Sequence, residues 1–120
     1  MQKKKNEIIT FIVSDLKDQK LFTELVEQLE KDILFSGLDV GSLNSESVKD
    51  YINSLNEFIE TTLRINPEKL RALFYRVDVK ESEITGLFQD SISNDDLILN
   101  LSKSLLYREL QKVISRKKYR

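Results

Sequence analysis

Apolar side chains recur every three or four residues along most of this chain, which is the spacing of one face of an α-helix. The pattern is clear from Phe22 to Ile33 and again from Val48 to Leu63. Residues that interrupt helices are scarce, because the 120 residues include three glycines and one proline against 40% hydrophobic residues. The sequence therefore predicts an all-α fold, a compact bundle of about five to six helices with mostly antiparallel neighbours.

A chain of this length matches the common size of one domain, so we expect residues 1–120 to form a single helical domain. The predicted helices cover about residues 4–18, the stretch from Phe22 to a turn at Gly37, about 48–64, a short segment after Pro67, a short segment after Asp78, and about 95–117. Two alternatives stay open. Residues 8–13 are rich in β-branched side chains and fit a strand, and residues 75–79 fit a short extended piece.

Local signals mark where the second helix ends and the third begins. Gly37 suits the left-handed residue that follows a helix, which brings the apolar pair Ile33 and Leu38 together in a Schellman motif. Ser47 and Asp50 then form a start signal of the capping-box type. We therefore predict a loop between these two helices.

Similar signals mark the later helices. Asn66 before Pro67 reads as an N-cap followed by proline at the first helical position. Asp78 reads as the cap of a fifth helix that ends near Gly86, and Ser93 or Asn94 reads as the cap of the last helix.

The missing residue types exclude much catalytic chemistry. The chain has no histidine, cysteine or tryptophan, so a Ser-His-Asp triad, a thiolate nucleophile and a Cys/His zinc site are excluded. The three glycines do not form a phosphate-binding loop, and the acidic pairs lack the spacing of a calcium loop. We therefore expect a protein that is not an enzyme, with no catalytic residues, no cofactor and no metal site.

The apolar stretches are too short for a membrane helix, which needs about 18 uninterrupted apolar residues. The basic start of the chain leads into an apolar run over residues 8–13, but this run is shorter than the core of a signal peptide and lacks a small-residue cleavage site. The expected location is the cytoplasm, with no membrane partner.

Charge is strongly segregated although the net charge is −1. Residues 21–60 include nine acidic and two basic side chains, whereas residues 101–120 include seven basic and one acidic. The last predicted helix is therefore the basic end of the molecule.

The last helix carries the candidate interaction surface. Its apolar face shifts midway by roughly a third of a turn, which we interpret as one half packing on this chain and the other on a different neighbour, such as a second subunit. Apolar residues at helical spacing lead into a basic ridge on the same face: Ile98, Leu101, Leu105, Arg108, Lys112 and Arg116.

Three interpretations of this ridge stay open: a solvated cationic face, pairing with the acidic second and third helices, and contact with phosphate or nucleic acid. We expect a small helical protein that acts through protein–protein contacts or self-association, such as a homodimer. The alternative is weak binding of nucleic acid or another anionic partner through the basic helix, which the slightly acidic whole chain disfavours. Arg76 and Asp78 form a second candidate, a polar pair that braces the junction between two helices.

Two short segments carry a family resemblance. Leu73-Phe74-Tyr75-Arg76-Val77-Asp78-Val79-Lys80-Glu81 and Arg108-Glu109-Leu110-Gln111-Lys112-Val113 are similar to a family of small bacterial all-helical proteins with a Tyr-Arg-aliphatic-Asp junction and an arginine-rich last helix. The resemblance covers about an eighth of the chain. It implies a bacterial cytoplasmic protein, and the family has no assigned activity to transfer.

Overall fold

The structure, a computed structural model, describes residues 18–118, of which residues 117 and 118 are described by their backbone alone. This part of the chain forms five helices and no strand, so the predicted all-α fold is confirmed. The helices are α2 (Gln19–Phe35), α3 (Val48–Ile65), α4 (Pro67–Val77), α5 (Glu81–Asp90) and α6 (Asn94–Lys118). The predicted helix over about 4–18 and the alternative strand over 8–13 lie outside the described residues.

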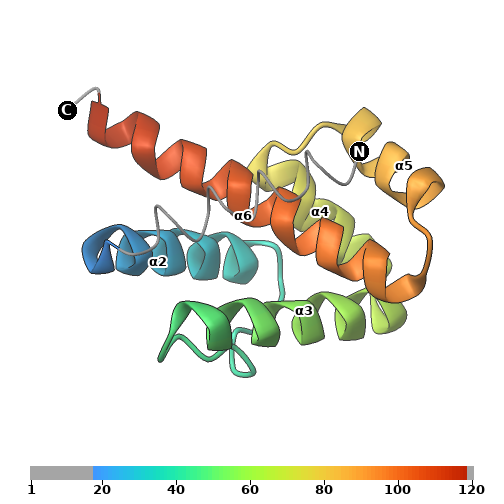
Figure 1. Cartoon of the computed structure of the whole chain (residues 1–120), viewed down its shortest axis with the longest axis horizontal. Helices are drawn as coiled ribbons and strands as arrows, with labels where there is room; N and C mark the ends of the chain where they lie inside the picture. The colour runs from blue at the N-terminus through green and yellow to red at the C-terminus, as the bar shows by residue number, and fades with distance from the viewer. Residues whose placement is uncertain (1–17, 119–120) are drawn as a thin grey trace.

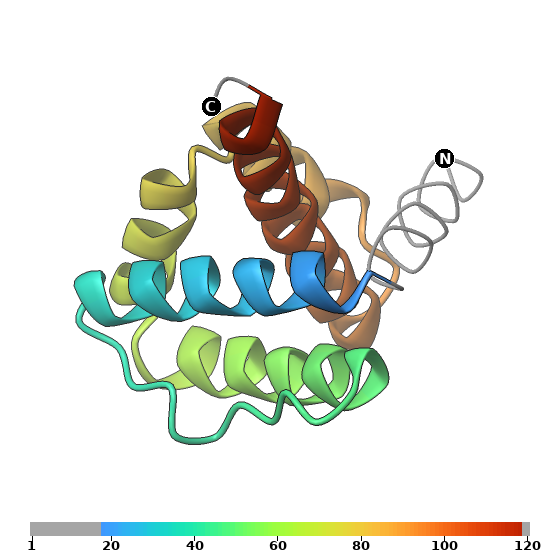
Figure 2. The same cartoon turned by 90° about the vertical axis from the view of Figure 1, so that its left-hand side faces the viewer.

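Helix α6 is the centre of the arrangement. It crosses α2 and α3 and also packs against α4 and α5, so it contacts each of the other described helices (Figures 1 and 2). Helix α4 in turn packs against α2 and α3. No helix within residues 18–118 combines the length and the apolar content that crossing a membrane requires.

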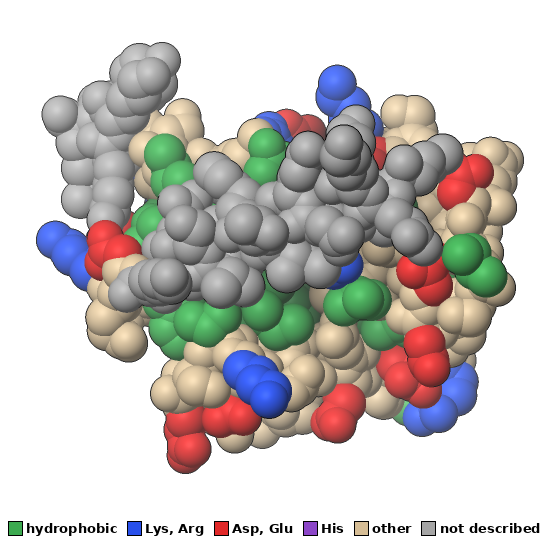
Figure 3. All heavy atoms as spheres, viewed as in Figure 1, with side chains coloured by type: hydrophobic (Ala, Val, Ile, Leu, Met, Phe, Trp, Pro, Cys, Tyr) green, Lys and Arg blue, Asp and Glu red, His purple; other side chains and the backbone are tan. Residues whose placement is uncertain are grey.

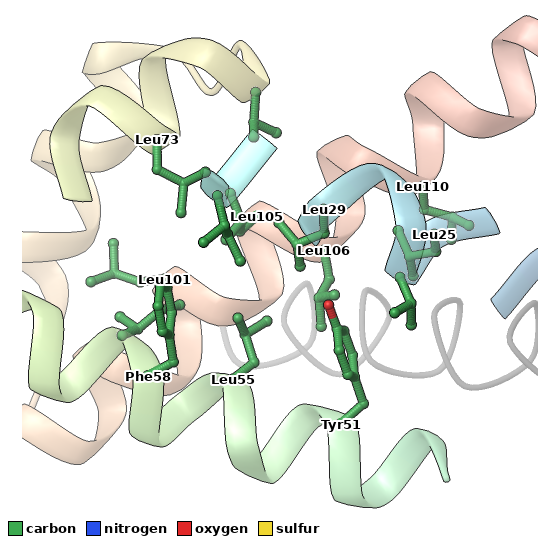
Figure 4. Close-up of a cluster of buried hydrophobic side chains, with 14 of the residues drawn as sticks. Leu25, Leu29, Tyr51, Leu55, Phe58, Leu73, Leu101, Leu105, Leu106 and Leu110 are labelled. Atoms are coloured by element: carbon green, nitrogen blue, oxygen red, sulfur yellow. The ribbon is translucent and has the colours of Figure 1, made fainter. Parts of the chain in front are cut away.

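The core lies where the apolar faces of α2, α3 and α4 converge on α6 (Figure 4). Leu29 of α2, Leu55 of α3 and Leu73 of α4 are fully buried there together with Leu105 of α6. The ring of Tyr51 packs edge-on against another aromatic ring and points its buried hydroxyl towards α6. The core is therefore formed by the apolar helix faces that the sequence predicted.

The helix ends predicted from local signals are confirmed at three positions. Gly37 has φ 82°, and the amide of Leu38 donates to the carbonyl of Ile33 at 3.1 Å, as in a Schellman motif. The Ser47 side chain accepts from the amide of Asp50 at 3.0 Å, and Asn66 caps α4 ahead of its proline. The last helix also starts as expected, because the Ser93 hydroxyl accepts from the amide of Asp96.

The prediction for Asp78 was wrong. Asp78 ends α4 in the left-handed conformation, with φ 73° and ψ 38°, and its amide donates to the carbonyl of Tyr75. Aspartate tolerates this conformation better than most side chains. Residues 75–77 are helical, so the extended alternative for this stretch was wrong as well.

Helix α5 differs from its prediction at both ends. It begins at Glu81 without a side-chain cap and continues past Gly86 to Asp90. A glycine can adopt the helical conformation, and Leu87 beyond it packs partly against the core. No residue of α5 is buried, so this helix is the least embedded of the five described ones.

Candidate functional site: a charged seam between α2, α4 and α6

The apolar half of the predicted surface lies inside the protein. Ile98, Leu101 and Leu105 are 4%, 1% and 0% exposed. The second apolar face of α6 is buried in the same chain, because Leu106 and Leu110 are 1% and 0% exposed. The interpretation that one face of α6 waits for a second subunit was therefore wrong: the shift between the faces arises because a central helix packs against neighbours on several sides.

The basic half of that surface makes contacts within the chain. Arg108 donates to the carbonyl and the carboxylate of Asp78, at 3.2 and 2.8 Å, and to the side chain of Gln111. Arg76 and Asp78 therefore do not pair with each other. Asp78 ties the α4–α5 junction to α6, whereas Arg76 reaches α2.

Arg76 meets one face of α2 that carries Gln28, Asp32 and Phe35, spaced at i, i+4 and i+7. Nε of Arg76 donates to Oδ1 of Asp32 at 3.0 Å, and the amide of Gln28 donates to Oδ2 at 3.0 Å. Nζ of Lys112 lies 3.7 Å from the same Oδ2. The Asp32 side chain is 4% exposed, so a buried carboxylate links three helices.

Glu109 lies beneath this carboxylate and is 0% exposed. Nζ of Lys112 is 3.5 Å from its Oε1, and neither carboxyl oxygen accepts a hydrogen bond. Burial raises the pKa of Glu109 to about 8, and the negative charge of Asp32 adds to the effect. At neutral pH Glu109 is therefore a neutral carboxylic acid next to the Asp32 carboxylate.

Asp32 behaves in the opposite way. Burial on its own raises the pKa of Asp32, but the neighbouring neutral Glu109 and the hydrogen bond from Gln28 act against it. The charge of Lys112 and the hydrogen bond from Arg76 act in the same direction, so the pKa of Asp32 falls below its ordinary value. The two acids thus share one negative charge, which two cations compensate.

The outer edge of this cluster is exposed. The guanidinium of Arg76 lies 4.6 Å from the centre of the Phe35 ring, a cation–π contact. Phe35 is 65% exposed, and the Arg76 side chain is 43% exposed. Arg116 donates to the side-chain oxygen of Gln28, a neutral acceptor, and no acidic side chain within residues 18–118 pairs with it.

We call this surface the charged seam and define it by the residues that these contacts connect: Gln28, Asp32, Phe35, Arg76, Lys112 and Arg116. The sequence predicted that Lys112 and Arg116 lie on one face of α6, four residues apart, and it marked Arg76 as a candidate. It missed Asp32 and Glu109, although each acid falls on the apolar stripe of its helix, and this was the available signal.

Three grooves are lined by residues of the described part of the chain. Two open on either side of the α4–α5 junction, with volumes of about 430 and 360 Å³, and share Asp78, Val79 and Lys80. The third is apolar, with a volume of about 80 Å³, and is lined by residues from α3 to α6. Neither Asp32 nor Glu109 lines any of the three, so the two acids face none of these openings. Within residues 18–118, no three acidic side chains gather in a way that suits a metal ion.

Comparisons with family models, with curated proteins and with solved structures give no match to this chain. The resemblance to small bacterial helical proteins stays a prediction.

Proposed function

We propose that this protein is a non-enzymatic helical module, located in the cytoplasm, that acts through contacts with other protein molecules, self-association included. The charged seam is the surface that makes the contact. The observation that carries the proposal is the exposed Phe35 ring with Arg76 stacked on it.

An exposed aromatic ring held by an arginine has the properties of an interface anchor. Aromatic residues and arginine are enriched among the side chains that contribute most to binding. Arg76 is fixed at Nε by the buried Asp32 carboxylate, so the pair is largely ordered before a partner arrives. Binding then costs less side-chain entropy than it would for a flexible pair.

Light scattering at a low and a high protein concentration tests this proposal. We expect the mean mass of the wild-type chain to rise with concentration and the Phe35→Glu variant to remain monomeric. Leu34→Glu is the matched control, because Leu34 is also exposed, at 56%, but lies on a different face of α2. A wild-type chain that stays monomeric contradicts self-association, and association that survives Phe35→Glu contradicts the role of the seam.

Binding of nucleic acid through the basic helix is the alternative. Arg108 and Lys112 already have acidic partners in this chain, so phosphate would have to displace Asp78, Asp32 or Glu109. This geometry favours protein contact. Retention of the chain on DNA or RNA at low salt, with release at higher salt, would favour the alternative.

A further inference from the structure

The charged seam presents its cations to solvent, whereas the acids beneath it are buried. The side chains of Asp32 and Glu109 are 4% and 0% exposed. The Arg76 side chain is 43% exposed, and Arg116 is exposed as well. Because Glu109 is neutral at neutral pH, Asp32 supplies the negative charge of the cluster against the three cations of the seam. The surface of the seam therefore carries an excess of positive charge, although the net charge of the chain is −1.

Two contacts fix the guanidinium of Arg76 in place. Its Nε donates to Oδ1 of Asp32 at 3.0 Å, and its Cζ lies 4.6 Å from the centre of the Phe35 ring. The two terminal nitrogens donate no hydrogen bond within residues 18–118. A guanidinium presents its N–H groups in a planar fork that matches the two oxygens of a carboxylate. The free edge of Arg76 is therefore ordered in advance for a carboxylate from outside the chain.

Two further cations flank the Arg76 site along α2, and both have neutral partners. Arg116 donates to the side-chain oxygen of Gln28 at one end. Nζ of Lys69 donates to the carbonyl of Gly37 at 3.0 Å at the other end. Neutral acceptors do not offset the charge of these two side chains. An acidic segment that lies along this part of α2 can therefore pair with three cations.

The surroundings of the seam limit the length of an anionic partner. Residues 21–60 include nine acidic and two basic side chains, and residues 81–100 include five acidic side chains and no lysine or arginine. Acidic side chains gather along the lower and right-hand edges of Figure 3, over α3 and α5. A nucleic-acid strand carries a charge on every nucleotide and would extend from the seam over these acids. A short acidic segment of a protein avoids them.

We propose that the partner of the charged seam is a short acidic segment of another protein, whose carboxylates pair with Arg76 and Arg116 while an apolar side chain packs on Phe35. This inference rests on the proposed function and adds to it the chemistry of the partner. The Phe35 ring is 65% exposed and lies against the guanidinium of Arg76. Acidic and apolar side chains are therefore neighbours in the segment that binds.

Fluorescence anisotropy with two labelled peptides tests this inference on the full chain. One peptide alternates glutamate with leucine, and the other has glutamine in place of each glutamate. We expect the chain to bind the glutamate peptide at least about tenfold more tightly at low salt, because each arginine–carboxylate pair adds a charge-assisted hydrogen bond. Arg76→Lys keeps the charge and loses the planar fork, so we expect it to bind the glutamate peptide several-fold more weakly.

Two variants with the same change in net charge form a matched pair. Arg116→Gln removes a cation of the seam, and Arg64→Gln removes an exposed cation of α3, which contributes no residue to the seam. We expect Arg116→Gln to weaken binding of the glutamate peptide and Arg64→Gln to change it by less than about twofold. Circular dichroism checks that each variant is helical. If Arg76→Lys does not fold, the matched pair decides the test.

Each outcome supports or overturns the inference. Equal binding of the two peptides, or equal losses in Arg116→Gln and Arg64→Gln, would show that the seam does not select carboxylates. Single-stranded DNA that binds more tightly than the glutamate peptide, and loses affinity in Arg76→Lys, would replace the acidic protein by nucleic acid. If neither peptide binds but Phe35→Glu abolishes self-association, this inference is wrong and the proposed function stands. If the glutamate peptide binds to a chain that stays monomeric, the inference stands and self-association is excluded.

Discussion

Glu109 lies on α6 three residues from Leu106 and one residue from Leu110, in the middle of the packed face. A carboxylate at such a position, with neither oxygen accepting a hydrogen bond, costs several kcal/mol. Keeping the proton removes most of this cost. The cluster is stable near neutral pH because one acid is neutral and the other is charged.

The pH dependence of stability follows from this arrangement. Glu109 has a pKa of about 8 in the folded chain against an ordinary value of 4.5. Between these values the folded chain holds the extra proton, so the free energy of unfolding falls as pH rises, by up to about 1.4 kcal/mol per pH unit. Glu109→Gln has nearly the same shape and cannot ionise, so we expect this dependence to disappear and the variant to be more stable than the wild type at pH 8.

Urea unfolding of both chains at several pH values between 5 and 8 measures this difference. Glu60→Gln on α3 is the control, because Glu60 is exposed. Parallel curves for the wild type and Glu109→Gln would contradict the account. Asp32 has the opposite effect on the pH dependence of stability. Its pKa is lowered on folding, so the stability it contributes is present above its ordinary pKa of 3.8 and is lost at more acid pH.

At the level of single residues, the sequence predicted only part of the charged seam. It placed Arg76, Lys112 and Arg116 among the candidates, because cations at regular spacing are visible without a structure. It did not indicate that Asp32 meets Arg76, which is 44 positions away. An acid on an apolar stripe signals a buried partner, but the identity of the partner depends on how the helices cross.

At the scale of single elements, local chemistry determines most helix boundaries. The caps at Ser47 and Asn66 and the Schellman motif at Gly37 involve residues within five positions of one another, so they were predictable. Asp78 was wrongly predicted to start a helix, because aspartate is common both at helix starts and at left-handed helix ends. Its role depends on Arg108, which comes 30 positions later.

Two glycines allow a test with opposite signs. Gly37 has φ 82°, which costs an alanine about 1–2 kcal/mol, so Gly37→Ala should lower the free energy of unfolding by about this amount. Gly86 lies within α5, and a Cβ there meets no atom within 4 Å. Gly86→Ala should therefore raise the free energy of unfolding by about 0.5–1 kcal/mol. Urea unfolding of the two variants checks both signs, and a shift in the same direction would contradict the assignment.

At the scale of the whole molecule, the sequence predicted the class of fold and not the place of each helix. The displaced apolar face of α6 was correctly recognised as a sign of two sets of neighbours. Both sets belong to this chain, because α6 crosses α2 and α3 and also packs on α4 and α5. Spacing along one helix reveals which faces are buried, whereas the origin of the covering surface depends on long-range contacts.

The charge segregation of the whole molecule gives a prediction for salt. If cations of the seam face acidic side chains of the bound molecule, raising NaCl from about 0.05 to about 0.5 M should weaken self-association several-fold, because salt screens exposed charges. A double variant, Arg76→Gln with Arg116→Gln, should associate more weakly and depend less on salt. Sedimentation equilibrium at the two salt concentrations measures both effects, and an equal salt dependence in the two proteins would argue against a charged contact.

The position of α6 in the sequence has a consequence for synthesis. A ribosome makes α2, α3, α4 and α5 before it makes the helix on which all four pack, at about 5–20 residues per second. The apolar stripes of the earlier helices therefore stay exposed to water until residues 98–113 have left the ribosome, which takes several seconds at this rate. A stop codon anywhere before Leu105 would leave a product without a core, so even a short loss at this end is expected to remove the protein from the cell by proteolysis.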